Sequence, residues 1–97
     1  MLPWFPFAVD FWDSPPVRRL SHNSKGILAD LMVALWRSPD CYLPDDETAI
    51  ASILRVSVLV WRRARLQLLD PNWPVLRSEQ GKISQDWLLG VHRKAIG

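Results

Sequence analysis

Arginine side chains clustered in one short segment give this sequence its clearest capacity for binding chemistry. Arg55, Arg62, Arg63 and Arg65 follow one another with apolar residues between them. A guanidinium group donates paired hydrogen bonds to phosphate oxygens and to guanine edges, which makes arginine a common contact to nucleic acid. Two further cations lie beyond this segment, in an expected hairpin. The candidate nucleic-acid contacts are therefore Arg55, Arg62, Arg63, Arg65, Arg77 and Lys82.

Charge is distributed unevenly along the 97 residues, although the net charge is only +2. Residues 1–54 contain four lysines or arginines against seven carboxylates, a net charge of −3, whereas residues 55–97 contain eight against three, a net charge of +5. A basic half favours an anionic partner, with double-stranded DNA considered first. Arginines that only keep a leucine-rich helix soluble would give the same pattern, so both interpretations stay open.

Leu59 and Leu66 interrupt the basic face of the helix expected over residues 58–69. At about 100° per residue, they lie on the same outward arc as Arg62 and Arg63. Leucines interleaved with arginines are typical of a protein interface, so these four residues are the candidate contacts to another protein or to a second copy of the chain in a homodimer. The alternative is that the hairpin or the N-terminal segment covers both leucines within the fold.

The residue types that carry out catalysis or bind metals are too scattered to form a site. His22 and His92 are far apart in the sequence, and neither has a cysteine or carboxylate at metal-ligand spacing. Cys41 has no neighbouring basic residue that would stabilise a thiolate. The carboxylates at 45–47 are explained by a helix N-terminus, whose dipole they complement. We therefore expect no catalytic residues, no metal site, no cofactor and no enzymatic activity.

Composition places the chain among single-domain globular proteins that have no membrane partner. Its 48% apolar and 23% charged residues are ordinary for such a domain. The most apolar segment, Ile27–Trp36, contains Asp30 and is too short to span a bilayer. One cysteine cannot build a disulfide framework, and the first residues lack the features of a secretory signal. These features predict a cytoplasmic protein.

Six tryptophans in so short a chain predict a core that is rich in large aromatic side chains. We expect burial of Trp12, Trp36, Trp61 and Trp87, and partial exposure of Trp4 and Trp73, which are flanked by prolines. Gly26, near the start of a helix, lowers helix stability and is expected to permit close approach of the aromatic N-terminal arm.

Prolines and capping residues divide the first two thirds of the chain into an arm and a helical core. Residues 1–19 contain four prolines, which forbid a long helix, so we expect an extended aromatic arm with a strand around Phe7–Val9. Residues 20–69 form a three-helix core, with helices expected over 20–36, 46–54 and 58–69. The expected N-caps are Ser21, Asp45 and Ser57. The expected inward residues of the second and third helices are Ala49, Ile50, Ile53, Leu54, Val60, Trp61, Ala64 and Leu68.

The last third of the chain predicts a β-hairpin and a final helix. Trp73–Arg77 and Lys82–Gln85 have strand character and are separated by a turn, which gives a hairpin wing over residues 72–85. A C-terminal helix is expected over residues 86–97. Three helices followed by a hairpin is the order of a winged helix, in which a helix-turn-helix carries a β-ribbon. The predicted fold class is mostly α (α+β), a single winged helix-turn-helix domain of residues 1–97.

Several short motifs taken together resemble one family. PWFPFAVDFW is followed by VRRLS and KG, by the leucine and tryptophan pattern of Leu31–Trp36, by LPDDE and by Ser57 with Trp61. This pattern, which covers roughly Leu2 to Ile83, is similar to that of the YdaU-like family of uncharacterised phage and prophage proteins. The resemblance implies a winged-helix domain related to replication, in the cytoplasm of a bacterial host.

Two functions of different class are compatible with these features. The first is non-enzymatic DNA binding in replication or regulation, through the six candidate cations. The alternative is a protein-interaction module that binds and modulates a host protein complex, either the replication machinery or a defence complex such as a CRISPR effector. The modest net charge weakens the first hypothesis, and the outward leucines favour the second.

Overall fold

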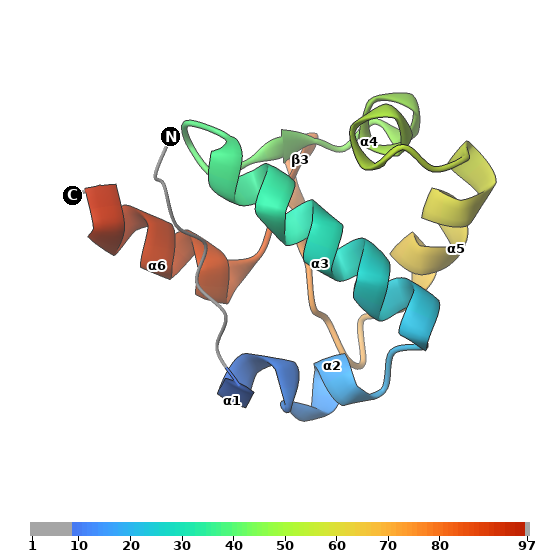
Figure 1. The fold of residues 1–97 in the computed structure, drawn as a ribbon, viewed down its shortest axis with the longest axis horizontal. Helices are drawn as coiled ribbons and strands as arrows, with labels where there is room; N and C mark the ends of the chain where they lie inside the picture. Colours follow the sequence, from blue (N-terminus) through green and yellow to red (C-terminus); the bar gives the residue numbers. More distant parts are fainter. Residues whose placement is uncertain (1–8, 97) are drawn as a thin grey trace.

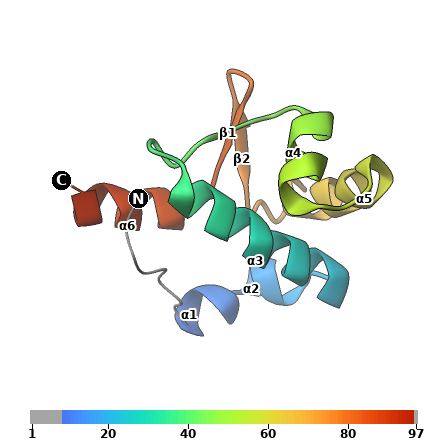
Figure 2. The same ribbon diagram turned by 45° about the horizontal axis from the view of Figure 1, so that its top comes forward.

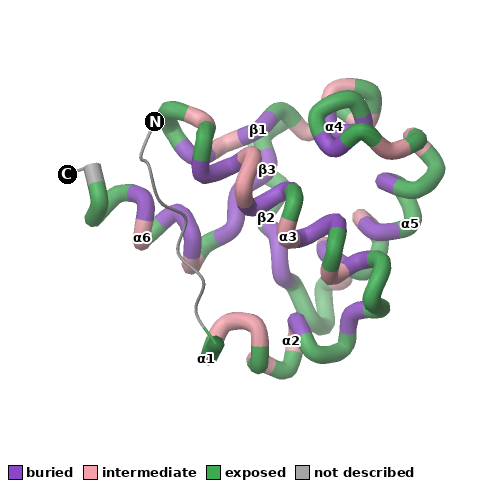
Figure 3. The backbone as a smooth tube through the Cα atoms, viewed as in Figure 1, coloured by how far each residue is buried: buried purple, intermediate pink, exposed green. Residues whose placement is uncertain are grey.

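The helix α3 (His22–Arg37) is the central element of the structure, a computed structural model that describes residues 9–96 (Figure 1). The Ser21 hydroxyl caps this helix by accepting a hydrogen bond of 3.2 Å from the Ser24 backbone N–H, and this cap confirms the sequence prediction. Buried and exposed residues alternate along α3, because its apolar residues recur every three or four positions (Figure 3). Its buried apolar residues are Ile27, Leu28, Leu31, Met32, Leu35 and Trp36.

The remaining elements pack around α3, with α4 and α5 toward one end and α6 near the other (Figure 1 and Figure 2). In chain order the other described elements are α1 (Val9–Trp12), α2 (Pro15–Arg18), β1 (Leu43–Pro44), α4 (Glu47–Leu54), α5 (Val58–Leu68), β2 (Arg77–Glu79), β3 (Lys82–Ser84) and α6 (Asp86–Ile96). The described chain is therefore mostly helical with a small antiparallel sheet, in agreement with the predicted α+β class.

The sheet has the strand order β1-β3-β2, and β3 pairs antiparallel with both neighbours. Leu43 of β1 lies opposite Ile83 of β3, which is fully buried. The hairpin turns at Gln80 and Gly81, whose φ angles of 53° and 73° are those of a two-residue turn. Figure 2 shows this hairpin extending away from the helices. The strand β1 was not predicted.

Residues 73–76, predicted as the first part of a strand, instead close the C-terminal end of α5. The backbone N–H groups of Val75 and Leu76 both donate to the carbonyl of Leu68, at 2.9 and 3.0 Å. A helix end leaves such carbonyls without a partner, so this contact satisfies one of them and prevents strand pairing there. Trp73 remains exposed beside it, as predicted.

The turn between α4 and α5 passes through Arg55, which adopts a left-handed backbone conformation with φ of 58°. Ser57 then caps α5, as predicted. The prediction that Asp45 caps α4 is wrong. Asp46 is the cap, and its carboxylate accepts a hydrogen bond of 3.0 Å from the Ala49 N–H. Asp45 is turned toward another element, so its side chain is not available to the helix end.

Two apolar residues predicted to face inward are exposed. The two-turn helix α4 packs through Ile50, Ala51 and Leu54, and this orientation leaves Ile53 45% exposed. On α5, Trp61 and the small Ala64 occupy the core face together with Leu68, as predicted, whereas Val60 lies at the edge of that face and is exposed.

The described part of the N-terminal segment is helical where an extended arm was predicted. Residues 9–18 form two single-turn helices, because Pro15 occupies the first position of α2, where its missing N–H costs no hydrogen bond. The ring of Phe11 stacks on Trp87 of α6 at a centroid distance of 5.1 Å. Trp4 and most of the strand expected around residues 7–9 lie outside the described residues.

Tryptophan burial follows the prediction in part. Trp36 and Trp61 are buried, whereas Trp12 and Trp87 are half-buried at the edge of the core. No described residue makes the close approach expected at Gly26, since an added Cβ there would meet none of their atoms within 4 Å, and Gly26 is exposed. The first eight residues of the arm lie outside the described part of the chain.

Candidate functional site

Helix α5 presents one face to the core and the opposite face to solvent. Leu59 and Leu66 are 53% and 75% exposed, and their positions are two turns apart on the same side of the helix. Arg62 and Arg63 lie between them in sequence and are exposed. We call Leu59, Arg62, Arg63 and Leu66 the α5 stripe. Neither the hairpin nor residues 9–19 cover these leucines, because both side chains are accessible, and the rest of the N-terminal arm lies outside the described residues.

Within the α5 stripe, Arg62 is paired with a carboxylate of the neighbouring helix. Its Nε and Nη2 donate to the two carboxylate oxygens of Glu47 at 2.7 and 2.8 Å. The hydrogen bonds from Arg62 hold the pKa of Glu47 below its usual value. The sequence predicts only that Glu47 complements the helix dipole; its position near Arg62 depends on the packing of α4 against α5. The positive charge of Arg62 is therefore neutralised by a carboxylate of the same chain.

Arg65 is neutralised in the same way, one turn further along α5. Its Nη2 donates to the Asp45 carboxylate at 2.8 Å, and the Ser78 hydroxyl donates to the same carboxylate. The hydrogen bonds from Arg65, then from Ser78, lower the pKa of Asp45. The Asp45 side chain is only 16% exposed, so this pair is more shielded from solvent than that of Arg62. The guanidinium of Arg65 therefore points toward Asp45 and not toward solvent.

The third paired cation is Arg77 on the hairpin. Its Nη1 donates to Glu79 at 3.0 Å and its Nη2 to Asp86 at 2.9 Å. Both carboxylates are largely exposed, so the pairs are accessible to salt and to competing ions. Three of the six predicted nucleic-acid contacts are thus already bound to carboxylates of this chain.

The other three predicted contacts have no ion pair with any residue between 9 and 95. Arg55 is exposed at the turn before α5, and Arg63 is exposed on the α5 stripe. Lys82 begins β3, and its Nζ lies 5.7 Å from the ring centroid of Tyr42. These three cations come from three different elements, the turn, the helix and the hairpin.

Residues with catalytic or metal-binding potential stay apart in the structure. His92 is buried on α6 and meets the edge of the Trp36 ring at a centroid distance of 5.1 Å, whereas His22 is exposed at the start of α3. Burial, then the nearby carboxylate of Asp40, raises the pKa of the Cys41 thiol to about 11. Within the described part of the chain, no three His, Cys, Asp or Glu residues are arranged to hold a metal ion.

Comparison of the chain with models of known protein families, with curated proteins and with solved structures finds no match in any of the three. None of the helices described for residues 9–96 is long and apolar enough to cross a membrane.

Proposed function

We propose that this chain is a non-enzymatic binding module of the winged-helix type that docks on another protein through the α5 stripe. The order of α3, β1, α4 and α5, followed by the β2–β3 hairpin, supports the winged-helix assignment. The resemblance to YdaU-like phage and prophage proteins supports a partner in the cytoplasm of a bacterial host, either its replication machinery or a defence complex.

The observation that carries the proposal is the exposure of Leu59 and Leu66 at the centre of the solvent-facing side of α5. An apolar centre with a charged rim is the usual composition of a protein interface. Arg63 supplies a free cation on this rim, and Arg62 with Glu47 supplies a neutral polar pair. Burial of the two leucines by a partner would remove them from water, and a carboxylate of the partner would pair with Arg63.

The carboxylates beside α5 disfavour the usual docking of such a helix on duplex DNA. Asp45, Asp46 and Glu47 lie at the start of α4, next to the arginines that would contact phosphates. Phosphate contacts depend on positive charge that is free to displace counterions. The positive charges of Arg62 and Arg65 are neutralised by their ion pairs with Glu47 and Asp45. The remaining carboxylate, that of Asp46, repels a backbone phosphate.

The test is the double variant Leu59→Glu/Leu66→Glu of the full chain, compared with Val9→Glu, which places a carboxylate at another exposed apolar residue. We expect the double variant to keep the melting temperature of the wild type and to lose both self-association and capture of host proteins, because the carboxylates cannot be desolvated in an interface. Light scattering and affinity capture from nuclease-treated host lysate measure these losses. Retention of both by a folded double variant would overturn the proposal.

DNA binding is the second candidate, and it is supported by the three unpaired cations Arg55, Arg63 and Lys82. Arg55 and Arg63 are exposed, and Lys82, which lies over the Tyr42 ring, forms no ion pair with a described residue, so each of the three can contact a phosphate. An electrophoretic shift of duplex DNA at low salt that disappears as salt increases would support this candidate. Absence of any shift at low salt would exclude it.

A further inference from the structure

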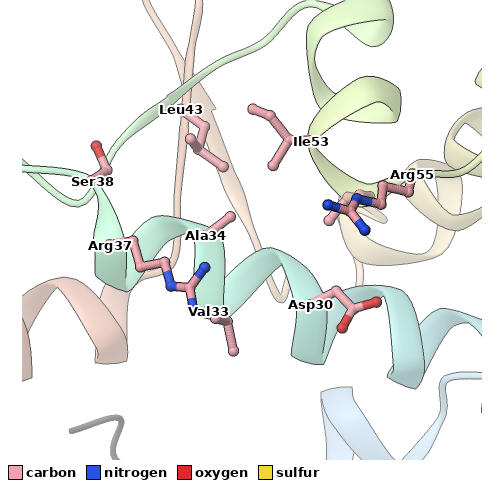
Figure 4. Close-up of a pocket in the computed structure, with 9 residues that line it drawn as sticks. Asp30, Val33, Ala34, Arg37, Ser38, Leu43, Ile53 and Arg55 are labelled. Carbon is pink, nitrogen blue, oxygen red and sulfur yellow. The ribbon is translucent and has the colours of Figure 1, made fainter. Parts of the chain in front are cut away.

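A groove of about 530 Å³ lies between α3 on one side and β1 with the end of α4 on the other (Figure 4). It shares no residue with the α5 stripe, so it is a separate surface. Its apolar lining consists of Val33, Ala34, Leu43, Ile53 and Leu54. Ile53 is 45% exposed here, a large aliphatic side chain that the fold leaves uncovered.

Two arginines flank this apolar lining. In Figure 4, Arg37 of α3 and Arg55 after α4 lie on opposite sides of Val33 and Ala34. Both arginines are exposed, and neither forms an ion pair with a residue between 9 and 95. Asp30 is the one carboxylate among the lining residues, and it lies on the side of Arg55. The groove therefore has an excess of positive charge around an apolar floor.

An apolar lining flanked by two arginines suits some ligands better than others. Duplex DNA presents mainly phosphates and sugars, and its few apolar groups, the thymine methyls, lie deep in the major groove, where they would not cover Ile53 and Val33. A wholly apolar segment would leave both guanidinium groups facing it without a partner. A peptide that alternates carboxylates with aliphatic or aromatic side chains satisfies both requirements, because each guanidinium pairs with a carboxylate in two parallel hydrogen bonds.

We infer that the groove between α3 and α4 binds an acidic, partly apolar peptide segment of a partner protein, with carboxylates on Arg37 and Arg55 and an apolar side chain against Val33 and Ile53. The inference is independent of the α5 stripe. A partner that contacts both surfaces would gain affinity from the two contacts together.

The experiment is selection of a random twelve-residue peptide library on the immobilised full chain, followed by fluorescence anisotropy with the enriched peptides. We expect enrichment of sequences that combine Asp or Glu with Leu, Ile or Phe. The variant Arg37→Gln/Arg55→Asn should bind these peptides at least about tenfold more weakly, since each lost charged hydrogen bond corresponds to roughly that factor. Asn is chosen for position 55 because it tolerates the left-handed backbone there.

Arg93→Gln is the matched control, because it removes an exposed arginine of α6 that lies outside both the groove and the α5 stripe, and binding should remain unchanged. Ile53→Gln tests the apolar contact separately and should also weaken binding, with the fold of each variant verified by circular dichroism. Enrichment of basic or charge-free sequences, equal affinity of wild type and the Arg37→Gln/Arg55→Asn variant, or loss of binding in Arg93→Gln would each overturn the inference. Because Leu59→Glu/Leu66→Glu leaves the groove intact, it should retain peptide binding, which separates this result from the test of the α5 stripe.

Discussion

The carboxylate of Asp45 accepts a hydrogen bond of 2.8 Å from the guanidinium of Arg65, across twenty positions of sequence. The same carboxylate accepts a hydrogen bond from the hydroxyl of Ser78 on the hairpin. One side chain between β1 and α4 therefore joins α5 to β2. This connection is one of the contacts that hold the hairpin against the helix that carries the exposed leucines.

Replacement Asp45→Asn should lower the free energy of unfolding by about 1 kcal/mol at pH 7, because a partly shielded charged hydrogen bond is lost. The pKa of Asp45 is lowered in the folded chain, so its contribution is present above the ordinary aspartate pKa and is lost as the pH falls below about 4. The variant should thus lose less stability than the wild type between pH 4 and pH 2, measured by urea denaturation. Glu47→Gln is the control for an exposed pair and should lower the urea midpoint at pH 7 less than Asp45→Asn does. Parallel acid profiles for wild type and Asp45→Asn would contradict this role of Asp45.

Gly26→Ala should stabilise the protein by about 0.5–1 kcal/mol, because alanine restricts the unfolded chain and favours the helix. The added Cβ meets no atom within 4 Å, so no packing cost opposes the gain. Gly81→Ala is the opposite control. Its φ of 73° disfavours an L side chain, and a loss of about 1–2 kcal/mol is expected although space is equally open. Guanidinium denaturation measures the free energy of unfolding of both variants, which should increase for Gly26→Ala and decrease for Gly81→Ala. A loss of stability in Gly26→Ala would show that the glycine has a role that its surroundings do not reveal.

Local signals were sufficient to predict much of the helical part of the fold. Ser21 and Ser57 cap α3 and α5 as predicted, because the cap is formed by residues only three positions apart. The two-residue strand β1 was missed, since Leu43 acquires strand geometry only by pairing with Ile83, forty positions away. The strand predicted over residues 73–76 is also wrong, because the N–H groups of Val75 and Leu76 donate to the carbonyl of Leu68 and not to a neighbouring strand.

The candidate site was predictable to the extent that it depends on one helix. Helical periodicity placed Leu59 and Leu66 on the outward side of α5, and their exposure confirms it. Periodicity does not reveal which carboxylates another helix brings near the arginines. The pairing of Arg62 with Glu47 depends on how α4 crosses α5, and that geometry is set by core packing. The prediction from the sequence therefore overestimated how much positive charge α5 has available for a partner.

The thiol of Cys41 should be nearly inert in the folded protein. It is fully buried and its pKa is raised to about 11, so at pH 8 labelling by iodoacetamide should be about 100-fold slower than for a free cysteine. Because the unfolded thiol ionises near pH 8.5, the folded state keeps its full stability below that pH and loses some as the pH rises toward 11. Mass spectrometry of the alkylated protein follows the reaction, with protein in denaturant as the control. Equal rates in the two conditions would show that the loop containing Cys41 is open to solvent.

The two arginines of the α5 stripe should differ in any binding to duplex DNA. Arg63 has no carboxylate partner among the described residues, whereas Arg62 must first break two hydrogen bonds to Glu47. For a complex with DNA, Arg63→Ala should therefore weaken binding and reduce the slope of log K against log salt by about 0.9, the effect of one phosphate contact. Arg62→Ala should change both quantities less.

Glu47→Gln sharpens the same comparison, because it releases Arg62 without altering the size of the side chain at position 47. If α5 contacts phosphates, this variant should bind duplex DNA more tightly than the wild type and with a steeper salt slope, since one more cation then displaces a counterion. Fluorescence anisotropy with a labelled duplex at several salt concentrations measures both changes. Equal slopes for wild type, Arg63→Ala and Glu47→Gln would remove duplex DNA as a partner of α5, and the exposed Leu59 and Leu66 would then be the binding groups of this helix.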